Sequence, residues 1–381
     1  MDVIVIVTLF FSLITGILWI GKVKDIFNPL VIFCFPLFLQ YTFYFILYKN
    51  EDEISIDTQI ILLYAITSFI IGVCISYCGA KKKAIGHYSK INFNREIFCF
   101  LCVFSILGLL LGLFEMYQFG MSRENVSFYT NVRFNVNYGK GYNPITIYGS
   151  LISKVLSCIL LYNLQFTKQK KVTFFFCAMS GVYCIIGTAR TDILMTFFSF
   201  LYLLENNFRK EIFGNKKGFV KFLKRFLIGS IIMLWIFIVI AELTGKLGSE
   251  KILDPDFFVF KYLGYPIPTF DRYILSNPSV SEGFFSLGIF GKILAEINIL
   301  EQKDYSSILP DNTVFNVYTF LGVPYLDGGI IGVLVCSLFL GIISGIIYKF
   351  SNLYGNVYTI FYALFSYAII MSFYAYQFNL T

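Results

Sequence analysis

Hydrophobic residues gather in blocks of about 20 along the chain, and short polar connections separate most of the blocks. A helix of about 20 apolar residues crosses the ~30 Å hydrocarbon layer of a membrane, so each block predicts one membrane-spanning helix. The ten blocks cover residues 3–21, 27–48, 58–79, 97–117, 145–167, 172–188, 190–205, 226–244, 326–349 and 356–378. This pattern predicts an all-α, polytopic integral membrane protein of about ten spans, with a range of 10–12, that forms a single integral membrane domain over residues 1–381.

Two regions leave the number of spans open. Blocks 172–188 and 190–205 are short and are separated only by Ala189 and its neighbours, which fits either a tight helical hairpin or a pair of partly broken helices. The run 284–297 is apolar apart from two charges but is short for a span, so we expect an interfacial or re-entrant helix. If it did span, the count would rise to eleven and the carboxyl terminus would change sides.

Basic residues in the connections predict the orientation. The connections after the first, third, fifth, seventh and ninth blocks carry 18 Lys and Arg in short segments, whereas the alternate side carries 11 spread over longer ones. The positive-inside rule therefore places both termini and the long connections 118–144 and 246–324 outside. We expect the larger of these outer loops to be partly helical, and loops of this length are usually functional.

Composition narrows the classes of function. Only 14% of the residues are charged, against about 25% in soluble domains, which excludes a soluble cytosolic enzyme. The net charge of +7 arises beside the spans, so it indicates orientation and not nucleic-acid binding. The single histidine, His87, lies in an inner connection, which excludes Ser-His-Asp, Cys-His and histidine-rich metal sites on the outer face. Phosphate-binding glycine loops are absent too, and no cofactor or metal is expected.

Arg190 lies between two apolar blocks, at the predicted outer boundary of the membrane. Its planar guanidinium could bind a phosphate at the level of the lipid headgroups. The alternatives are an interfacial anchor and a local ion pair with Asp192.

Arg272 lies in the larger outer loop, where Pro266 and Pro268 stiffen the backbone and aromatic residues flank the charge. Such a stretch can offer rings for sugar stacking beside an anion-binding group. The alternative is a solvated arginine paired with the neighbouring Asp271.

Carboxylates on the outer side could accept a proton from a sugar hydroxyl if burial raised their pKa. The candidates are Glu282, Glu296, Asp311 and Asp327. A second group of charges falls within or near the ends of spans, where lipid makes them costly, so we expect them to face partners or water. This group is Glu115, Lys154, Glu205 and Glu242.

Three stretches resemble the Wzy-type oligosaccharide repeat-unit (O-antigen) polymerases. They are Gly-Thr-Ala-Arg-Thr-Asp-Ile-Leu at 187–194, Asn-Val-Tyr-Thr-Phe-Leu at 316–321, and Pro-Tyr-Leu-Asp-Gly-Gly-Ile-Ile-Gly at 324–332. Arg272, followed by ten residues and Gly283, also looks like the Arg-x10-Gly pattern of outer loops in this family. The likeness covers roughly residues 180–350.

The resemblance implies a metal-independent glycosyltransferase in the bacterial inner membrane with its active site facing the periplasm. It would move a glycan from undecaprenyl pyrophosphate onto a second lipid-linked repeat unit and so build O-antigen or capsular polysaccharide, together with a chain-length regulator. Arg190 and Arg272 would bind the pyrophosphate, with Arg123 or Arg133, and Glu282 or Asp327 would orient or deprotonate the acceptor hydroxyl. The aromatic residues expected to contact substrate are Tyr265, Tyr273, Tyr318 and Tyr325.

Three other functions stay open. An O-antigen ligase shares the many spans and the large outer loop but would use an outer-face histidine, which this chain lacks. A flippase or other transporter of lipid-linked oligosaccharides would show internal repeats and short loops. A non-catalytic scaffold would tolerate replacement of Arg190 and Arg272.

Overall fold

The computed structural model describes residues 25–48, 53–77, 89–92, 94–167, 169–187, 190–214, 216–243, 258–276, 286, 296–297 and 318–377. Within these ranges the chain is helical, and its β structure is limited to an isolated bridge between Thr319 and Ala375. The predicted all-α, polytopic class is therefore confirmed. The predicted first span, 3–21, lies outside the described residues.

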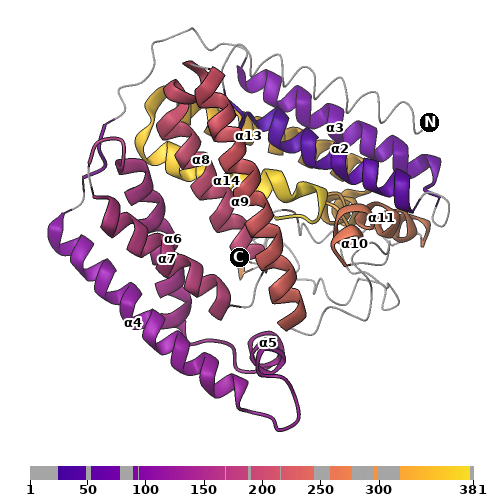
Figure 1. Cartoon of the computed structure of the whole chain (residues 1–381). Coiled ribbons are helices and arrows are strands. Elements are labelled where there is room, and N and C mark those ends of the chain that lie inside the picture. Colours follow the sequence, from indigo (N-terminus) through magenta and orange to yellow (C-terminus); the bar gives the residue numbers. More distant parts are fainter. Residues whose placement is uncertain are drawn as a thin grey trace. The chain divides into compact units, whose positions relative to one another are not determined.

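Each of the other predicted blocks coincides with a helix (Figure 1). The helices are α2 (Pro29–Leu47), α3 (Ile56–Tyr77), α4 (Arg95–Gly120), α5 (Phe128–Tyr138), α6 (Pro144–Asn163), α7 (Lys170–Ile186), α8 (Arg190–Gly214), α9 (Lys216–Leu243), α10 (Phe258–Gly264), α11 (Pro266–Leu275), α13 (Gly322–Tyr354), α14 (Asn356–Ile370) and the 3₁₀ turn η3 (Met371–Phe373). In the described part of the chain, seven helices are long and apolar enough to cross a membrane: α2, α3, α4, α6, α9, α13 and α14. Two of the remaining helices, α7 and α8, form a pair joined by residues 187–189, as the hairpin prediction allows.

Two helices differ from their predicted blocks. Helix α9 begins at Lys216, ahead of the apolar block, because its first turns are rich in lysine and lysine is a good helix former. Helix α13 contains a break at Gly328 and Gly329, where the backbone leaves helical geometry. Gly329 has a φ of 57°, a left-handed conformation that glycine adopts without steric cost. The break directly follows Asp327.

The chain divides into two compact units, which are described separately. The first contains residues 1–84, 250–349 and 368–381. Its helices α3 and α13 approach closely because small residues face one another: a Cβ built on Gly341 would lie 2.2 Å from the carbonyl oxygen of Phe69. Phe69 also stacks on Phe33 of α2, with ring centroids 3.8 Å apart. Packing through small residues is typical of membrane helices, which gain little from hydrophobic burial against one another.

The second unit contains residues 85–249 and 350–367. A core cluster that includes Met116, Leu156, Phe176 and Met179 joins α4, α6 and α7. Polar groups connect the same helices: the hydroxyl of Tyr183 donates to the carbonyl of Ser105 at 2.6 Å. Satisfying such groups internally is required where no water reaches them.

Candidate functional site

Helix α11 carries the first predicted site arginine, and its sequence explains how that arginine is displayed. Pro266 occupies the first turn, where its missing N–H costs no hydrogen bond. The helix buries Ile267, Phe270 and Tyr273, whereas Arg272 is exposed. Helix α11 is thus a short amphipathic helix of the larger loop with Arg272 on its exposed side.

Asp271 anchors this helix to the start of α3. Its Oδ1 accepts hydrogen bonds from the backbone N–H of Ser55 at 2.9 Å, from the Ser55 hydroxyl, and from the Thr58 hydroxyl at 2.7 Å. Asp271 is only 4% exposed. A carboxylate at the amino terminus of a helix is also favoured by the helix dipole. Asp271 therefore caps the amino terminus of α3 from another helix, α11. This role differs from the pairing with Arg272 that the sequence suggested.

Arg272 lies over an aromatic ring. The central carbon of its guanidinium is 5.5 Å from the centroid of the Tyr265 ring, within the range of a cation–π interaction. Tyr265 in turn meets the ring of Tyr48 edge-on at 5.3 Å. The stack restricts the rotamers of Arg272, which lowers the entropy lost when the guanidinium binds an anion.

A second set of aromatic rings joins α11 to Tyr318 and to the start of α13. The ring centroid of Tyr273 is 5.1 Å from that of Tyr318 and 6.3 Å from that of Tyr325, and Phe270 meets Tyr325 at 5.8 Å. Tyr273 and Tyr318 are buried, so their rings support the cluster. Tyr265 and Tyr325 are partly exposed and are the members of the predicted set that a ligand can reach most readily.

Asp327 lies at the break in α13 and contacts the larger loop. Its Oδ2 accepts the backbone N–H of Ser286 at 2.6 Å, while the carbonyl of Ser286 accepts the Tyr376 hydroxyl at 2.7 Å. Burial raises the pKa of Tyr376, with smaller contributions from Cys336 and from the Asp327 carboxylate, so this hydroxyl stays protonated and donates. One loop residue is thereby held through both of its backbone groups.

The second unit contains the other predicted arginines. Arg123 lies over the ring of Phe134, 3.6 Å from its centroid, in the smaller loop. The side-chain amide of Asn131 donates to the carbonyls of Gly120 and Arg123, both at 3.0 Å, which fixes the turn between α4 and α5. Arg133 lies on α5 and is partly exposed.

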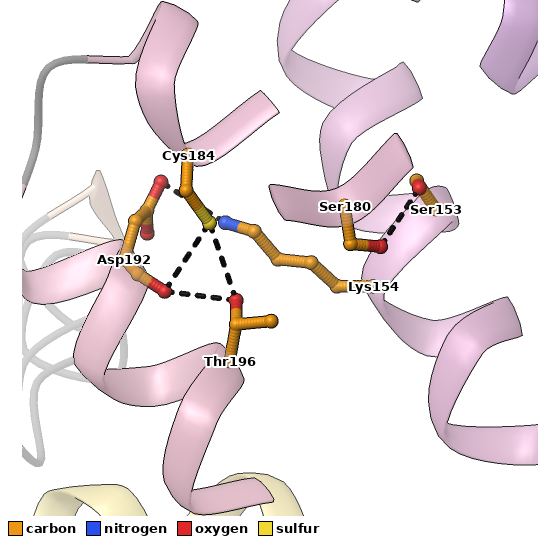
Figure 2. A network of polar contacts seen from close by, with 6 residues as sticks. All are labelled: Ser153, Lys154, Ser180, Cys184, Asp192 and Thr196. Atoms are coloured by element: carbon orange, nitrogen blue, oxygen red, sulfur yellow. Dashed lines mark hydrogen bonds and ion pairs between the residues drawn. The ribbon is translucent and has the colours of Figure 1, made fainter. Parts of the chain in front are cut away.

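Three predicted candidates fall wholly or partly outside the described residues. Arg190 is the first residue of α8, but its side chain lies outside them, as do all of Glu282 and all of Asp311. The carboxylate of Asp192, which the sequence suggested as a partner of Arg190, forms an ion pair with Lys154 at 3.0 Å (Figure 2).

Lys154 and Glu115 illustrate the expectation that charges within or near the ends of spans face partners or water. Lys154 meets Asp192, and Glu115 accepts the backbone N–H of Asn143 at 3.1 Å and the Thr146 hydroxyl at 2.8 Å. The roles of Asp271 and Tyr376 were missed, because a single sequence does not pair distant residues. The signal that could have indicated the anchored helix start is Ser55 and Thr58, which lie at the beginning of the apolar block 58–79.

Fold and site together define a polytopic, helical membrane protein with a displayed arginine and accessible aromatic rings. Comparison with protein-family models, with curated proteins and with solved structures gives no match. In the described part of the chain, no group of three or more His, Cys, Asp and Glu side chains could hold a metal ion.

Proposed function

We propose that this protein is a membrane glycosyltransferase that polymerises undecaprenyl-pyrophosphate-linked oligosaccharide repeat units on the periplasmic side of the bacterial inner membrane. The observation that carries the proposal is the display of Arg272 on a helix whose inner face is fixed by Asp271 and by packed tyrosines. A guanidinium restricted in this way suits a pyrophosphate, whose oxygens accept two parallel hydrogen bonds from one arginine.

The reaction requires a good leaving group and an acceptor. A hydroxyl oxygen of the acceptor glycan forms a glycosidic bond with the anomeric carbon of the donor, and the bond between that carbon and the pyrophosphate oxygen breaks. Polyprenyl pyrophosphate departs with the bonding electron pair. Arg272 neutralises the charge that grows on the pyrophosphate, and a fixed positive group is most effective because it needs no reorganisation during the reaction.

Asp327 is the carboxylate that we propose to receive the proton of the acceptor hydroxyl. The Ser286 N–H orients its Oδ2, and the glycine break directly after it interrupts the helix at this point. Tyr265 and Tyr325 offer partly exposed ring faces, on which the apolar faces of sugar rings stack. Arg190, Arg123 and Arg133 are further anion-binding candidates, and Glu282 is the alternative carboxylate.

Reconstitution tests the proposal. Purified protein in liposomes, supplied with a polyprenyl-pyrophosphate-linked repeat unit from its host, should produce a ladder of glycans on a gel. Arg272→Ala should lower the rate by about 10²–10³-fold, the usual cost of one group that stabilises the transition-state charge. Lys261→Ala, which removes a cation from the neighbouring helix α10, is the matched control and should retain the ladder.

The outcomes separate the open alternatives. A ladder made equally well by Arg272→Ala would remove Arg272 from the site. Transport of the lipid carrier across the bilayer without a ladder would favour a flippase, and transfer of a preformed glycan to a different acceptor lipid would favour a ligase.

A further inference from the structure

An ion pair between a buried lysine and a partly exposed aspartate lies in the second unit, outside the arginine and tyrosine site. Lys154, near the middle of the apolar helix α6, is 4% exposed, and its ammonium is 3.0 Å from Oδ2 of Asp192 on α8 (Figure 2). A lysine at mid-helix in a membrane span costs several kcal/mol unless it is paired, so ionisable residues there are usually functional. The Asp192 side chain is 38% exposed, and an ion pair with one solvated partner adds little to stability, which makes stability a weak reason for its presence.

Several contacts beside the Lys154–Asp192 pair involve the first turn of α8. Asp192 lies in the first turn of that helix, and its backbone carbonyl accepts the Thr196 hydroxyl at 2.8 Å and the thiol of Cys184 at 3.5 Å. Cys184 belongs to α7, so the first turn of α8 is tied to α7 by its backbone and to α6 by its side chain.

The adjacent interface between α6 and α7 is also polar. Ser180 of α7 shares hydrogen bonds with Ser153 at 2.9 Å and with Ser157 at 2.8 Å, both on α6. These hydroxyls hold α6 and α7 together beside Lys154. The backbone from which the Lys154 side chain extends is therefore held in place.

The turn fixed in this way also carries Arg190. Helix α8 begins at Arg190, two residues before Asp192, so both belong to the same helical turn. The ion pair to α6 and the thiol contact to α7 together restrict both the axial position and the rotation of that turn. Any group on the turn is then held at a defined place.

We infer that Lys154 is a positioning residue: through Asp192 it fixes the first turn of α8 and with it the backbone of Arg190, which we propose as one of the arginines that bind the anionic group of the substrate. This inference rests on the proposed function. Lys154 itself is buried and does not touch substrate; it acts through the helix turn.

A doubly neutral variant separates positioning from simple structural support. Lys154→Met with Asp192→Leu removes both charges, so no unpaired charge stays buried and folding should survive. The matched control is Ser153→Ala with Ser180→Ala, which changes the same helix interface without touching the pair. Lys154→Arg keeps the charge.

Two measurements are made on these variants. In liposomes supplied with the lipid-linked repeat unit, the doubly neutral variant should lose at least about tenfold in kcat with a smaller change in KM, because a misplaced charge weakens mainly the transition state. Lys154→Arg should recover most of the activity. Hydrogen exchange should rise in the amides of residues 190–196 of the doubly neutral variant and stay unchanged in the serine control.

Each result decides the question. Wild-type kcat in the doubly neutral variant, unchanged exchange at 190–196, or failure of that variant to fold would each overturn the positioning role. If the unaltered protein makes no polymer, the proposed function fails. Faster exchange confined to residues 190–196 would then still show that the pair fixes this turn.

Discussion

Replacing Asp271 measures how firmly α11 is held and therefore how rigidly Arg272 is displayed. One carboxylate oxygen of this buried residue accepts three hydrogen bonds from Ser55 and Thr58 at the start of α3. Asp271→Leu removes the acceptor and leaves an N–H and two hydroxyls to find other partners. Asp271→Asn removes only the charge, because the amide oxygen can accept the same bonds.

The magnitudes follow from these contacts. A hydrogen bond to a charged group contributes about 1.5–3 kcal/mol, and three bonds that share one oxygen do not add fully. Asp271→Leu should therefore lower the free energy of unfolding by about 3–5 kcal/mol, the cost of leaving buried polar groups without their acceptor. Asp271→Asn should cost about 1–2 kcal/mol, since neutral hydrogen bonds are roughly half as strong as charged ones.

Denaturant titration of the purified protein in detergent gives the free energies of unfolding. Arg272→Ala is the control from the same helix: it should lower stability by no more than about 1 kcal/mol, the size of an exposed cation–π contact, while lowering the rate of polymer formation about 10²–10³-fold. Asp271 does not anchor α11 if the free energy of unfolding of Asp271→Leu lies within about 0.5 kcal/mol of that of the unaltered chain. The same conclusion follows if Asp271→Asn lowers this free energy as much as Asp271→Leu does.

Three further predictions concern other parts of the chain. Gly341→Val should destabilise the first unit by about 2–3 kcal/mol, because a Cβ there would lie 2.2 Å from the Phe69 carbonyl; thermal unfolding in detergent would show it, and an unchanged midpoint would contradict the close approach of α3 and α13. Glu115→Leu should cost about 1–3 kcal/mol in the same assay, because the Thr146 hydroxyl and a backbone N–H lose their acceptor. A cysteine at Ser122 should react from the outside of intact cells with a membrane-impermeant maleimide, and labelling only after permeabilisation would reverse the predicted orientation.

The helices could be predicted from the sequence for a physical reason. Lipid offers no hydrogen bonds to the backbone, so a long apolar block that crosses the membrane has to be a helix unless it belongs to a closed barrel. Blocks 58–79 and 97–117 accordingly coincide with α3 and α4 within a few residues. The extension of α9 to Lys216 was not predicted, because hydropathy detects the apolar stretch and not the polar helical turns before it.

Individual residues of the site could be predicted from the sequence, but the contacts that hold them could not. Proline and aromatic neighbours pointed to Arg272, and the structure gives it an exposed position over Tyr265. The anchor of its helix could not be predicted, because Ser55 lies 216 positions from Asp271 and a single sequence does not show which distant polar groups meet. The same holds for Lys154, whose need for a partner was predictable but whose partner was not.

A polymerase of the proposed kind forms glycosidic bonds and releases polyprenyl pyrophosphate. The most direct test follows both products in liposomes that contain the purified protein and the lipid-linked repeat unit. We expect one polyprenyl pyrophosphate released for each bond that lengthens the glycan, and we expect both products to form about 10²–10³-fold more slowly in Arg272→Ala. Lipid carrier that crosses the bilayer while its glycan stays attached and unextended would contradict this expectation.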